Sequence, residues 1–166
     1  MNINKPQDML TVELREIYSA ERQLSRALPR LQKAAQADTV KECLQVRRDQ
    51  GEGLIEDVDS VFDELGISKG RQKNFAMEGL IEEAQGLLES IKDEKMNDAA
   101  IIAAVQKMEH YCMAAWGTVA AVGKAMGSEK TEKVFQKALS EGKDLDKKMT
   151  EIAVKEINPA MLKEAS

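Results

Sequence analysis

Gln106-Lys-Met-Glu-His-Tyr-Cys-Met-Ala-Ala-Trp116 is the centre of the most apolar helical pattern in the sequence. Steps of three and four residues through this region follow one side of a helix and predict a core-facing stripe. Its members are Ile102, Val105, Glu109, Cys112, Trp116, Val119 and Met126. The stripe carries one carboxylate and one thiol halfway along a buried surface. In a helical bundle, such a carboxylate is explained either by a metal ion held between facing helices or by a buried ion pair.

The composition places this stripe in a single all-α domain. The chain has 166 residues, of which 43% are hydrophobic and 32% are charged, as in a globular protein with one core. Aromatic residues make up only 4% of the chain, and the plentiful Ala, Leu, Met, Glu, Lys and Gln lose little side-chain freedom in a helix. We therefore predict one helical domain over residues 1–166.

Charge and hydropathy narrow the classes of partner. The net charge is -5 and no Lys/Arg cluster is free of acidic neighbours, which argues against nucleic acid as a partner. No window reaches the roughly 18 apolar residues that a membrane-spanning helix needs, and the N-terminus has no apolar signal segment. We therefore expect a cytoplasmic protein that does not bind membranes. In a reducing compartment, Cys43 and Cys112 are expected to stay thiols.

The first half of the chain predicts a helical hairpin. A helix starting at Pro6 carries the stripe Leu10, Leu14, Ile17, Glu21, Leu24, Leu28, Leu31 and Ala35. A second helix, capped by Asp38 or Thr39 with a capping box to Glu42, ends at Gly66. Its stripe is Val40, Leu44, Arg47, Gly51, Leu54, Val58, Val61 and Leu65. Charged residues or glycine thus stand at mid-height in both stripes.

The second half predicts a second hairpin, reached through a crossover. After a loop at 67–73, a short amphipathic helix over residues 75–88 forms the long connection. The fourth helix is capped by Asn97 or Asp98 and continues to Gly127. The fifth starts at a Ser128 cap and ends before Asn158-Pro159, and its stripe is Phe135, Ala138, Gly142, Leu145, Met149 and Ile152.

The predicted centre of this bundle has only some of the ligands that a di-metal site requires. Di-iron and di-manganese bundles take a Glu from each of two helices and a Glu-x-x-His pair from each of the other two. Glu21 and Glu109 supply carboxylates, but the sequence contains no Glu-x-x-His. The only histidine, His110, lies next to the core stripe, and we interpret it as a hydrogen-bonded structural residue.

Three segments carry a family resemblance: Tyr18-Ser-Ala-Glu-Arg-Gln-Leu-Ser-Arg-Ala-Leu-Pro29, Ala76-Met-Glu-Gly-Leu-Ile-Glu-Glu-Ala84 and Asp98-Ala-Ala-Ile-Ile-Ala-Ala-Val-Gln-Lys-Met-Glu-His-Tyr111. Over nearly its whole length, the sequence resembles the YciE/YciF family of ferritin-like bacterial stress proteins. The resemblance implies a ferritin-like four-helix bundle with an additional short crossover helix. It also implies a dimer, as is usual in the family, and an association with stress responses.

The chain departs from the metal ligands that the resemblance implies. Family members look as though they present Glu on the first helix, His-x-x-Glu on the second, Glu-His-Tyr-Glu on the fourth and Glu-Glu-Lys on the fifth. Here the second helix has Arg47-Arg-Asp-Gln50, the fourth has Cys112 in the last place, and the fifth has Glu141-Gly142-Lys143. Only Glu21 and Glu109 remain, as the remnant of a ligand set.

Two buried carboxylates without a metal ion need a positive charge nearby. Arg47 is our first candidate for a structural ion pair with them, and Lys143 is the second. The helical alignment places Arg47 more than one turn from the level of Glu21, so the contact depends on the length of the arginine side chain.

These observations favour a non-enzymatic, stress-associated homodimer with a degenerate di-metal centre and no cofactor. We expect no catalytic residues, because the sequence has no Ser-His-Asp set, no glycine-rich phosphate loop and no Cys-x-x-Cys pair. The alternative is an oxidase or peroxidase with a di-iron or di-manganese centre. It would use Glu21 and Glu109 with auxiliary acids from Asp49, Glu52, Glu141 and Asp146. A third hypothesis is an interaction module, in which the surface around Trp116 or the crossover helix meets a protein partner that the sequence does not identify.

Overall fold

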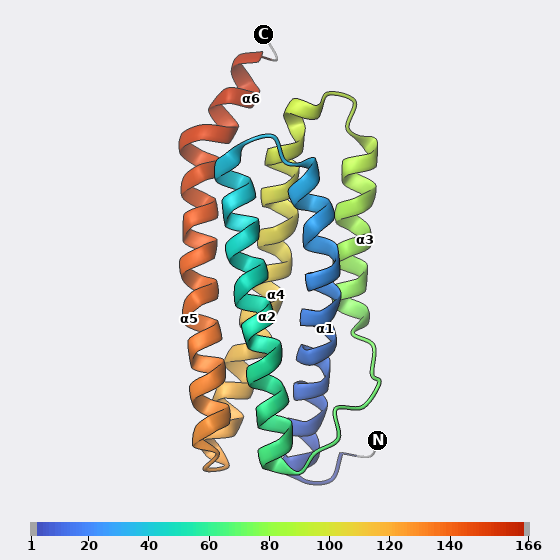
Figure 1. Ribbon diagram of the computed structural model, residues 1–166, viewed down its shortest axis with the longest axis vertical. Helices are drawn as coiled ribbons and strands as arrows, with labels where there is room; N and C mark the ends of the chain where they lie inside the picture. Colours follow the sequence, from blue (N-terminus) through green and yellow to red (C-terminus); the bar gives the residue numbers. More distant parts are fainter. Residues whose placement is uncertain (1–2, 165–166) are drawn as a thin grey trace.

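A computed structural model of the chain describes residues 3–164, and all regular secondary structure in that range is helical (Figure 1). The four long helices are α1 (Pro6–Ala34), α2 (Asp38–Leu65), α4 (Asn97–Ala125) and α5 (Glu129–Ile152). The shorter α3 (Phe75–Ser90) is followed by a 3₁₀ turn at Glu94–Met96, and a π-helical turn at Ala153–Ile157 joins α5 to α6 (Asn158–Glu164). The predicted all-α fold, with four long helices and a crossover helix, is confirmed.

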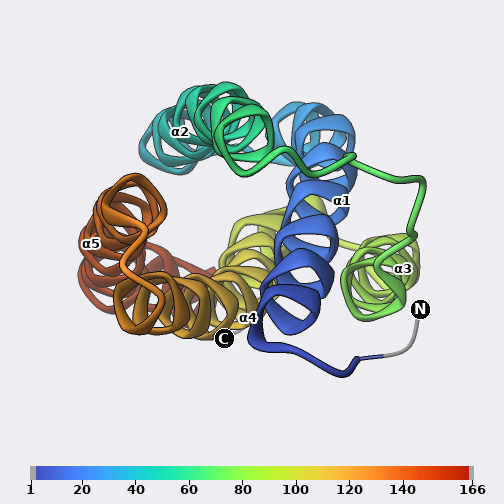
Figure 2. The same ribbon diagram turned by 90° about the horizontal axis from the view of Figure 1, so that it is seen from below.

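The four long helices form a ring in the order α1, α2, α5, α4, and each packs on its two neighbours (Figure 2). Helices α1 and α5 run in one direction, and α2 and α4 run in the other (Figure 1). Because α2 and α4 are parallel, the chain must return along the bundle between them. The segment 66–74 and α3 make this return, and α3 packs outside the ring against α1 and α4.

The core is formed by the stripes that the helical spacing predicts. Every predicted stripe residue from Leu10 to Ala35 is buried, and so are the central members of the stripes on α2, α4 and α5. Three residues at stripe ends, Leu65, Met126 and Ile152, are only partly buried. The regular alternation of three and four residues thus predicts the inward face of each long helix correctly. None of the helices between residues 3 and 164 is both long and apolar enough to cross a bilayer.

The α1–α2 turn is held differently from the prediction, because the expected capping box is absent. The Thr39 hydroxyl donates to the Glu156 carboxylate (3.1 Å) instead of capping α2. Asp98, predicted as the cap of α4, accepts the backbone N–H groups of Gln36 (2.8 Å) and Ala37 (2.9 Å). A carboxylate from the start of α4 therefore satisfies backbone donors of a turn that lies about sixty residues earlier in the chain.

The predicted end of the last helix before Asn158-Pro159 is also wrong. After α5, the π-helical turn leads into α6, where Pro159 is the second residue. Proline has no backbone N–H to donate, and here it follows Asn158, whose N–H bonds the Ala153 oxygen at the end of the π-helical turn. At the other end of α5, Ser128 is the N-cap residue, as predicted, but its hydroxyl lies 2.8 Å from that of Thr131 and makes no capping hydrogen bond to the backbone.

The crossover is anchored by Asn74, which is fully buried. Its side-chain oxygen accepts the backbone N–H of Met77 (2.8 Å) and caps α3. Its side-chain amide nitrogen donates to the backbone oxygen of Glu16 (3.1 Å) and to the Tyr111 hydroxyl (2.6 Å). The backbone N–H of Asn74 donates to Ser19 Oγ (2.9 Å). One residue thus fixes the start of α3 to both α1 and α4.

We expect Asn74→Ala to lower the free energy of unfolding by about 2 to 3 kcal/mol, because it removes a helix cap and leaves buried partners unsatisfied. The matched control is Asn158→Ala at an exposed position of α6, which should change the free energy by less than about 0.5 kcal/mol. Urea denaturation followed by circular dichroism measures both. Equal effects of the two substitutions would contradict an anchoring role for Asn74.

Candidate functional site

The structure brings Glu21, Arg47 and Glu109 together at the centre of the bundle. Glu21 comes from α1, Arg47 from α2 and Glu109 from α4, and each side chain is only 1% exposed. All three belong to core stripes that are otherwise apolar, so the helical periodicity that buries the neighbouring leucines and valines also buries these charges. We call these three residues the ion cluster.

One guanidinium group bridges the two carboxylates. Arg47 Nε donates to Oε2 of Glu109 at 2.6 Å, and Nη2 donates to Oε1 and Oε2 of Glu21 at 3.0 and 2.9 Å. The same Nη2 lies 3.8 Å from Sγ of Cys112. The arginine side chain is long enough to cover the axial offset that the sequence alignment indicated. The fixed fork of the guanidinium allows it to bond two carboxylates from different helices at once.

Two glycines leave the space that the ion cluster occupies. A Cβ on Gly51 would lie 2.9 Å from Nη1 of Arg47. A Cβ on Gly142 would lie 2.7 Å from both Oε1 of Glu109 and Cζ3 of Trp116. The Trp116 ring in turn lies against the guanidinium, with 5.4 Å between the guanidinium carbon and the ring centroid. Glycine at these two stripe positions therefore lets a long cation and an indole fit into a closely packed interior.

Burial and ion pairing act on the pKa values of Glu109 and Arg47 in the ion cluster. Desolvation raises the pKa of Glu109, and the nearby Arg47 offsets only part of this effect. Burial also opposes the charged form of Arg47, but Glu21 and Glu109 outweigh it and raise the pKa of the guanidinium above its ordinary value. Arg47 is therefore always charged, while Glu109 holds a proton more readily than it would in water. Within residues 3–164, Oε1 of Glu109 has no hydrogen-bond partner.

Cys112 lies against the ion cluster as a thiol. Burial raises its pKa well above the ordinary value, and the negative charge of Glu21 adds to this effect. The thiol beside Arg47 therefore stays protonated at neutral pH. Cys43 is likewise a buried free cysteine, and burial raises its pKa too.

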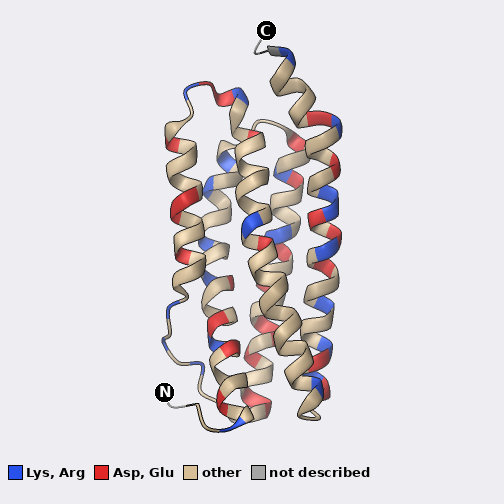
Figure 3. Ribbon diagram, turned by 180° about the vertical axis from the view of Figure 1, so that it is seen from behind, with Lys and Arg blue, Asp and Glu red and all other residues tan. Residues whose placement is uncertain are grey.

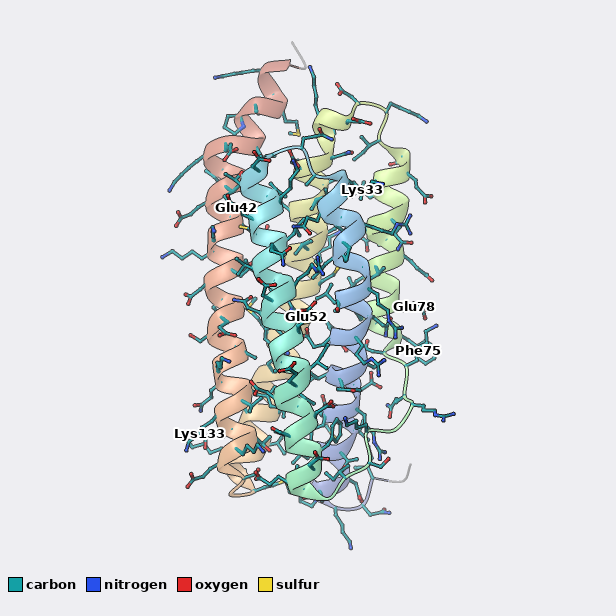
Figure 4. All side chains as sticks on the ribbon, viewed as in Figure 1. Lys33, Glu42, Glu52, Phe75, Glu78 and Lys133 are labelled. Carbon is teal, nitrogen blue, oxygen red and sulfur yellow. The ribbon has the colours of Figure 1, made fainter. Side chains whose placement is uncertain are left out.

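The other acids considered from the sequence do not join the ion cluster. Asp49 is exposed and accepts a hydrogen bond from Gln45 (2.8 Å). Glu52 has a 57% exposed side chain on α2 (Figure 4) and lies 3.8 Å from Arg48. Glu141 is half-buried in the lining of a groove of about 290 Å³ between α2 and α5. None of these carboxylates supplements Glu21 and Glu109.

Asp146 and His110 form a separate surface pair. Asp146 Oδ1 accepts from Gln106 Nε2 (2.9 Å) and lies 3.1 Å from Nε2 of His110, whose side chain is 64% exposed. His110 therefore lies outside the core, in a hydrogen-bonded contact between α4 and α5. Lys143, the second candidate for a neutralising charge, is exposed on α5.

The residues at the centre do not fit a di-metal site. Among residues 3–164, no group of three or more His, Cys, Asp or Glu side chains is placed to hold a metal ion. The two buried carboxylates instead bond the cationic side chain of Arg47, which cannot act as a ligand. A pair of hard divalent ions needs several oxygen or nitrogen ligands to replace its hydration shell.

The crossover topology and the long helices define a ferritin-like helical bundle, in which a buried arginine bridges two carboxylates at the centre. Residues 5–162 match the family described as Domain of unknown function (DUF892), and the chain belongs to this family. It is 38% identical to Protein YciF of Escherichia coli (strain K12) over 159 residues, which cover 95% of this chain and 96% of that protein. The predicted family membership is confirmed.

Two solved structures are similar over nearly their whole length. The structure of the E. coli stress protein YciF, which has a ferritin-like fold, matches with a TM-score of 0.89 at 37% identity and covers 94% of this chain and 99% of that chain. YcfI from Rhodopseudomonas palustris matches with a TM-score of 0.86 at 32% identity, covering 90% of this chain and 95% of that chain. The fold predicted from the resemblance is therefore correct.

We expect Arg47→Leu to lower the free energy of unfolding by about 3 to 5 kcal/mol, because it leaves two buried carboxylates without a cation. The matched control is Arg48→Leu, which removes only a partly exposed ion pair and should change the free energy by less than about 1 kcal/mol. The triple variant E21Q/R47L/E109Q should recover part of the loss, since it leaves no buried charge. Chemical denaturation measures all three variants. A change below about 1 kcal/mol for Arg47→Leu would exclude the neutralising role.

The raised pKa of Glu109 predicts a pH-dependent effect of Glu109→Gln. Folding makes this carboxyl bind its proton more tightly than its ordinary pKa of 4.5 implies, so its contribution to stability is greatest below pH 4.5. That contribution falls as the pH rises from 4.5 through the folded-state pKa. The glutamine does not titrate, so the free energy of unfolding of the variant should improve relative to the native protein over this window. Urea unfolding at a series of pH values measures the difference, and a difference that is constant with pH would contradict the assignment.

Proposed function

We propose that this protein is a non-enzymatic, stress-associated member of its family, in which the ion cluster has replaced an ancestral di-metal centre. The observation that carries the proposal is the bridge from Arg47 to both Glu21 and Glu109 at the centre of the bundle. The stress association is supported by the similarity to the E. coli stress protein YciF. The proposal includes a homodimer located in the cytoplasm, as the sequence predicts.

The replacement involves several helices, and its parts fit one another. Arg47 stands where the family resemblance implies a histidine, and Cys112 and Gly142 stand where it implies glutamates. The guanidinium supplies the positive charge that metal ions would bring to the two remaining carboxylates. The absence of a side chain at Gly142 makes room for Glu109 and Trp116, since even a Cβ there would come within 2.7 Å of both.

The ion cluster has the properties of a structural element. Its three members come from α1, α2 and α4, so it links three of the four long helices at mid-height. It presents no thiolate and no histidine. The alternative function, a di-iron or di-manganese oxidase or peroxidase, would require Arg47 to leave a site in which it bonds both carboxylates. It would also require further ligands from acids that lie at the surface.

Metal analysis of protein purified without a histidine tag tests the proposal. After expression in medium containing iron and manganese, the chain should carry far less than one metal ion, and a chelator should leave its melting temperature unchanged, because no ion stabilises the folded state. Near-stoichiometric iron or manganese, or a lower melting temperature after chelation, would favour the oxidase or peroxidase.

A variant with three of the implied ligands restored provides the positive control. R47H/Q50E/C112E introduces a histidine and two glutamates and leaves Gly142 unchanged, because a side chain there would collide with Glu109 and Trp116. We expect this variant to gain bound Mn²⁺, as in di-metal carboxylate bundles. Manganese should raise the melting temperature of this variant and not that of the native protein. Equal manganese binding by both proteins would contradict a lost centre, and circular dichroism checks that the variant folds.

A further inference from the structure

A groove between α1 and the crossover segment is lined by basic residues. Its volume is about 560 Å³, and it lies between residues 15–26 of α1 and residues 69–73. Six of its eleven lining residues are Lys or Arg and none is Asp or Glu, although the whole chain has 29 acidic and 24 basic residues. The six are Arg15, Arg22, Arg26, Lys69, Arg71 and Lys73. We call this feature the basic groove.

The fold builds the basic groove from two segments that are distant in the sequence. One wall is formed by three arginines on one face of α1, spaced seven and four residues apart. The other wall is formed by the crossover segment, in which basic and uncharged residues alternate. Arg15 fixes the two walls together, because its Nε and Nη2 donate to the backbone oxygen of Ser68 at 2.9 and 2.7 Å. Gly70 has a φ of 69°, and a Cβ there would lie 3.0 Å from Nε of Arg15. The crossover therefore turns tightly over α1.

Tyr18 holds two of the cations in the basic groove. The guanidinium carbon of Arg22 lies 5.6 Å from the centroid of the Tyr18 ring, and Lys69 Nζ lies 5.7 Å from it. The ring is itself fixed by an edge-on contact with Phe62, at 5.7 Å between centroids. Cation–π contacts of this kind position charges before any ligand arrives, which reduces the entropy lost on binding.

Half of the cations in the basic groove keep an uncompensated charge. Lys69 pairs with Asp59 (2.7 Å), and Lys73 pairs with Glu78 at the start of α3. By contrast, no ion pair within residues 3–164 involves Arg22, Arg26 or Arg71. Three like charges gathered in one groove repel one another, so an anion bound among them would be stabilised.

We propose that the basic groove binds a small, multiply charged phosphate compound, such as a short oligophosphate or a polyphosphorylated metabolite. Guanidinium groups match phosphate oxygens in two-point hydrogen bonds, and the volume lies in the usual range for small-ligand pockets. A long polyanion fits less well. Acidic and basic residues are interspersed over α2, α4 and α5 (Figure 3), and the charged residues of α3 are all acidic. These acids and the net charge of -5 would repel the flanking parts of a nucleic acid. This proposal does not depend on the absence of a metal centre.

Isothermal titration calorimetry with tripolyphosphate tests the basic groove. The variant R22Q/R26Q/R71Q removes three exposed charges, and its affinity should fall by at least about 100-fold, since each lost phosphate–guanidinium contact is worth roughly tenfold. The matched control K143Q/K147Q/K148Q removes the same charge from exposed positions of α5. Its affinity should stay within about threefold of the native protein, because distant surface charges are screened. Circular dichroism checks that both variants fold.

The outcomes separate the proposal from its competitors. Loss of tripolyphosphate binding in the groove variant alone supports it. No binding by the native protein at millimolar tripolyphosphate overturns the proposal. An equal loss of affinity in the α5 control also overturns it, because binding would then depend only on the overall charge. A single-stranded oligonucleotide that binds more tightly than tripolyphosphate, and that the groove variant no longer binds, would overturn the small anion in favour of nucleic acid.

Discussion

The bridge that Arg47 makes between Glu21 and Glu109 is the interaction on which the interior of this bundle depends. Each carboxylate is 1% exposed, and an unpaired charge at such depth would be destabilising by several kcal/mol. A lysine could not replace the arginine, because a single ammonium group lacks the fork that reaches two acids from different helices. Burial also raises the pKa of Glu109, so this carboxyl takes up a proton more readily than it would in water, which eases the excess of two acids over one guanidinium. The electrostatic balance at the centre thus depends on residues of three helices.

The second constraint is the space available in the core around the ion cluster, and it requires glycine at two positions. Neighbouring stripe positions hold closely packed Leu, Val and Phe side chains, so a long arginine and an indole enter only where other side chains are missing. Gly51 faces the guanidinium and Gly142 faces Glu109 and Trp116, each at a distance that excludes a Cβ. The chemistry of the centre is therefore not a property of any one helix. A single substitution toward a metal ligand would meet either a bonded guanidinium or a filled space.

The sequence predicts the fold well because the fold depends on periodicity, and it predicts the contacts less well because they depend on distant partners. Alternating steps identify the buried faces of all four long helices, including Glu21 and Glu109. The predicted helix ends are less accurate. Asp98 accepts the backbone N–H groups of Gln36 and Ala37 in the α1–α2 turn, a contact that no local capping rule predicts. The resemblance suggested which ligands are missing, but only coordinates show that Arg47 spans the gap. The sequence does not predict the basic groove, because its two walls come from α1 and from a segment some fifty residues away in the chain.

The proposed loss of a metal centre is compatible with an unchanged fold, because the two tasks of a central cation are separable. One task is electrostatic, since carboxylates brought together in a low-dielectric core need a positive charge, and a guanidinium provides it as well as an ion does. The other task is coordination chemistry, which requires ligands and an open position that a guanidinium lacks. A covalently attached cation also does not dissociate, so the stability of the bundle ceases to depend on the metal supply. With the structural role proposed for the centre, recognition falls to the surface, where the basic groove between α1 and the crossover segment is the proposed anion site.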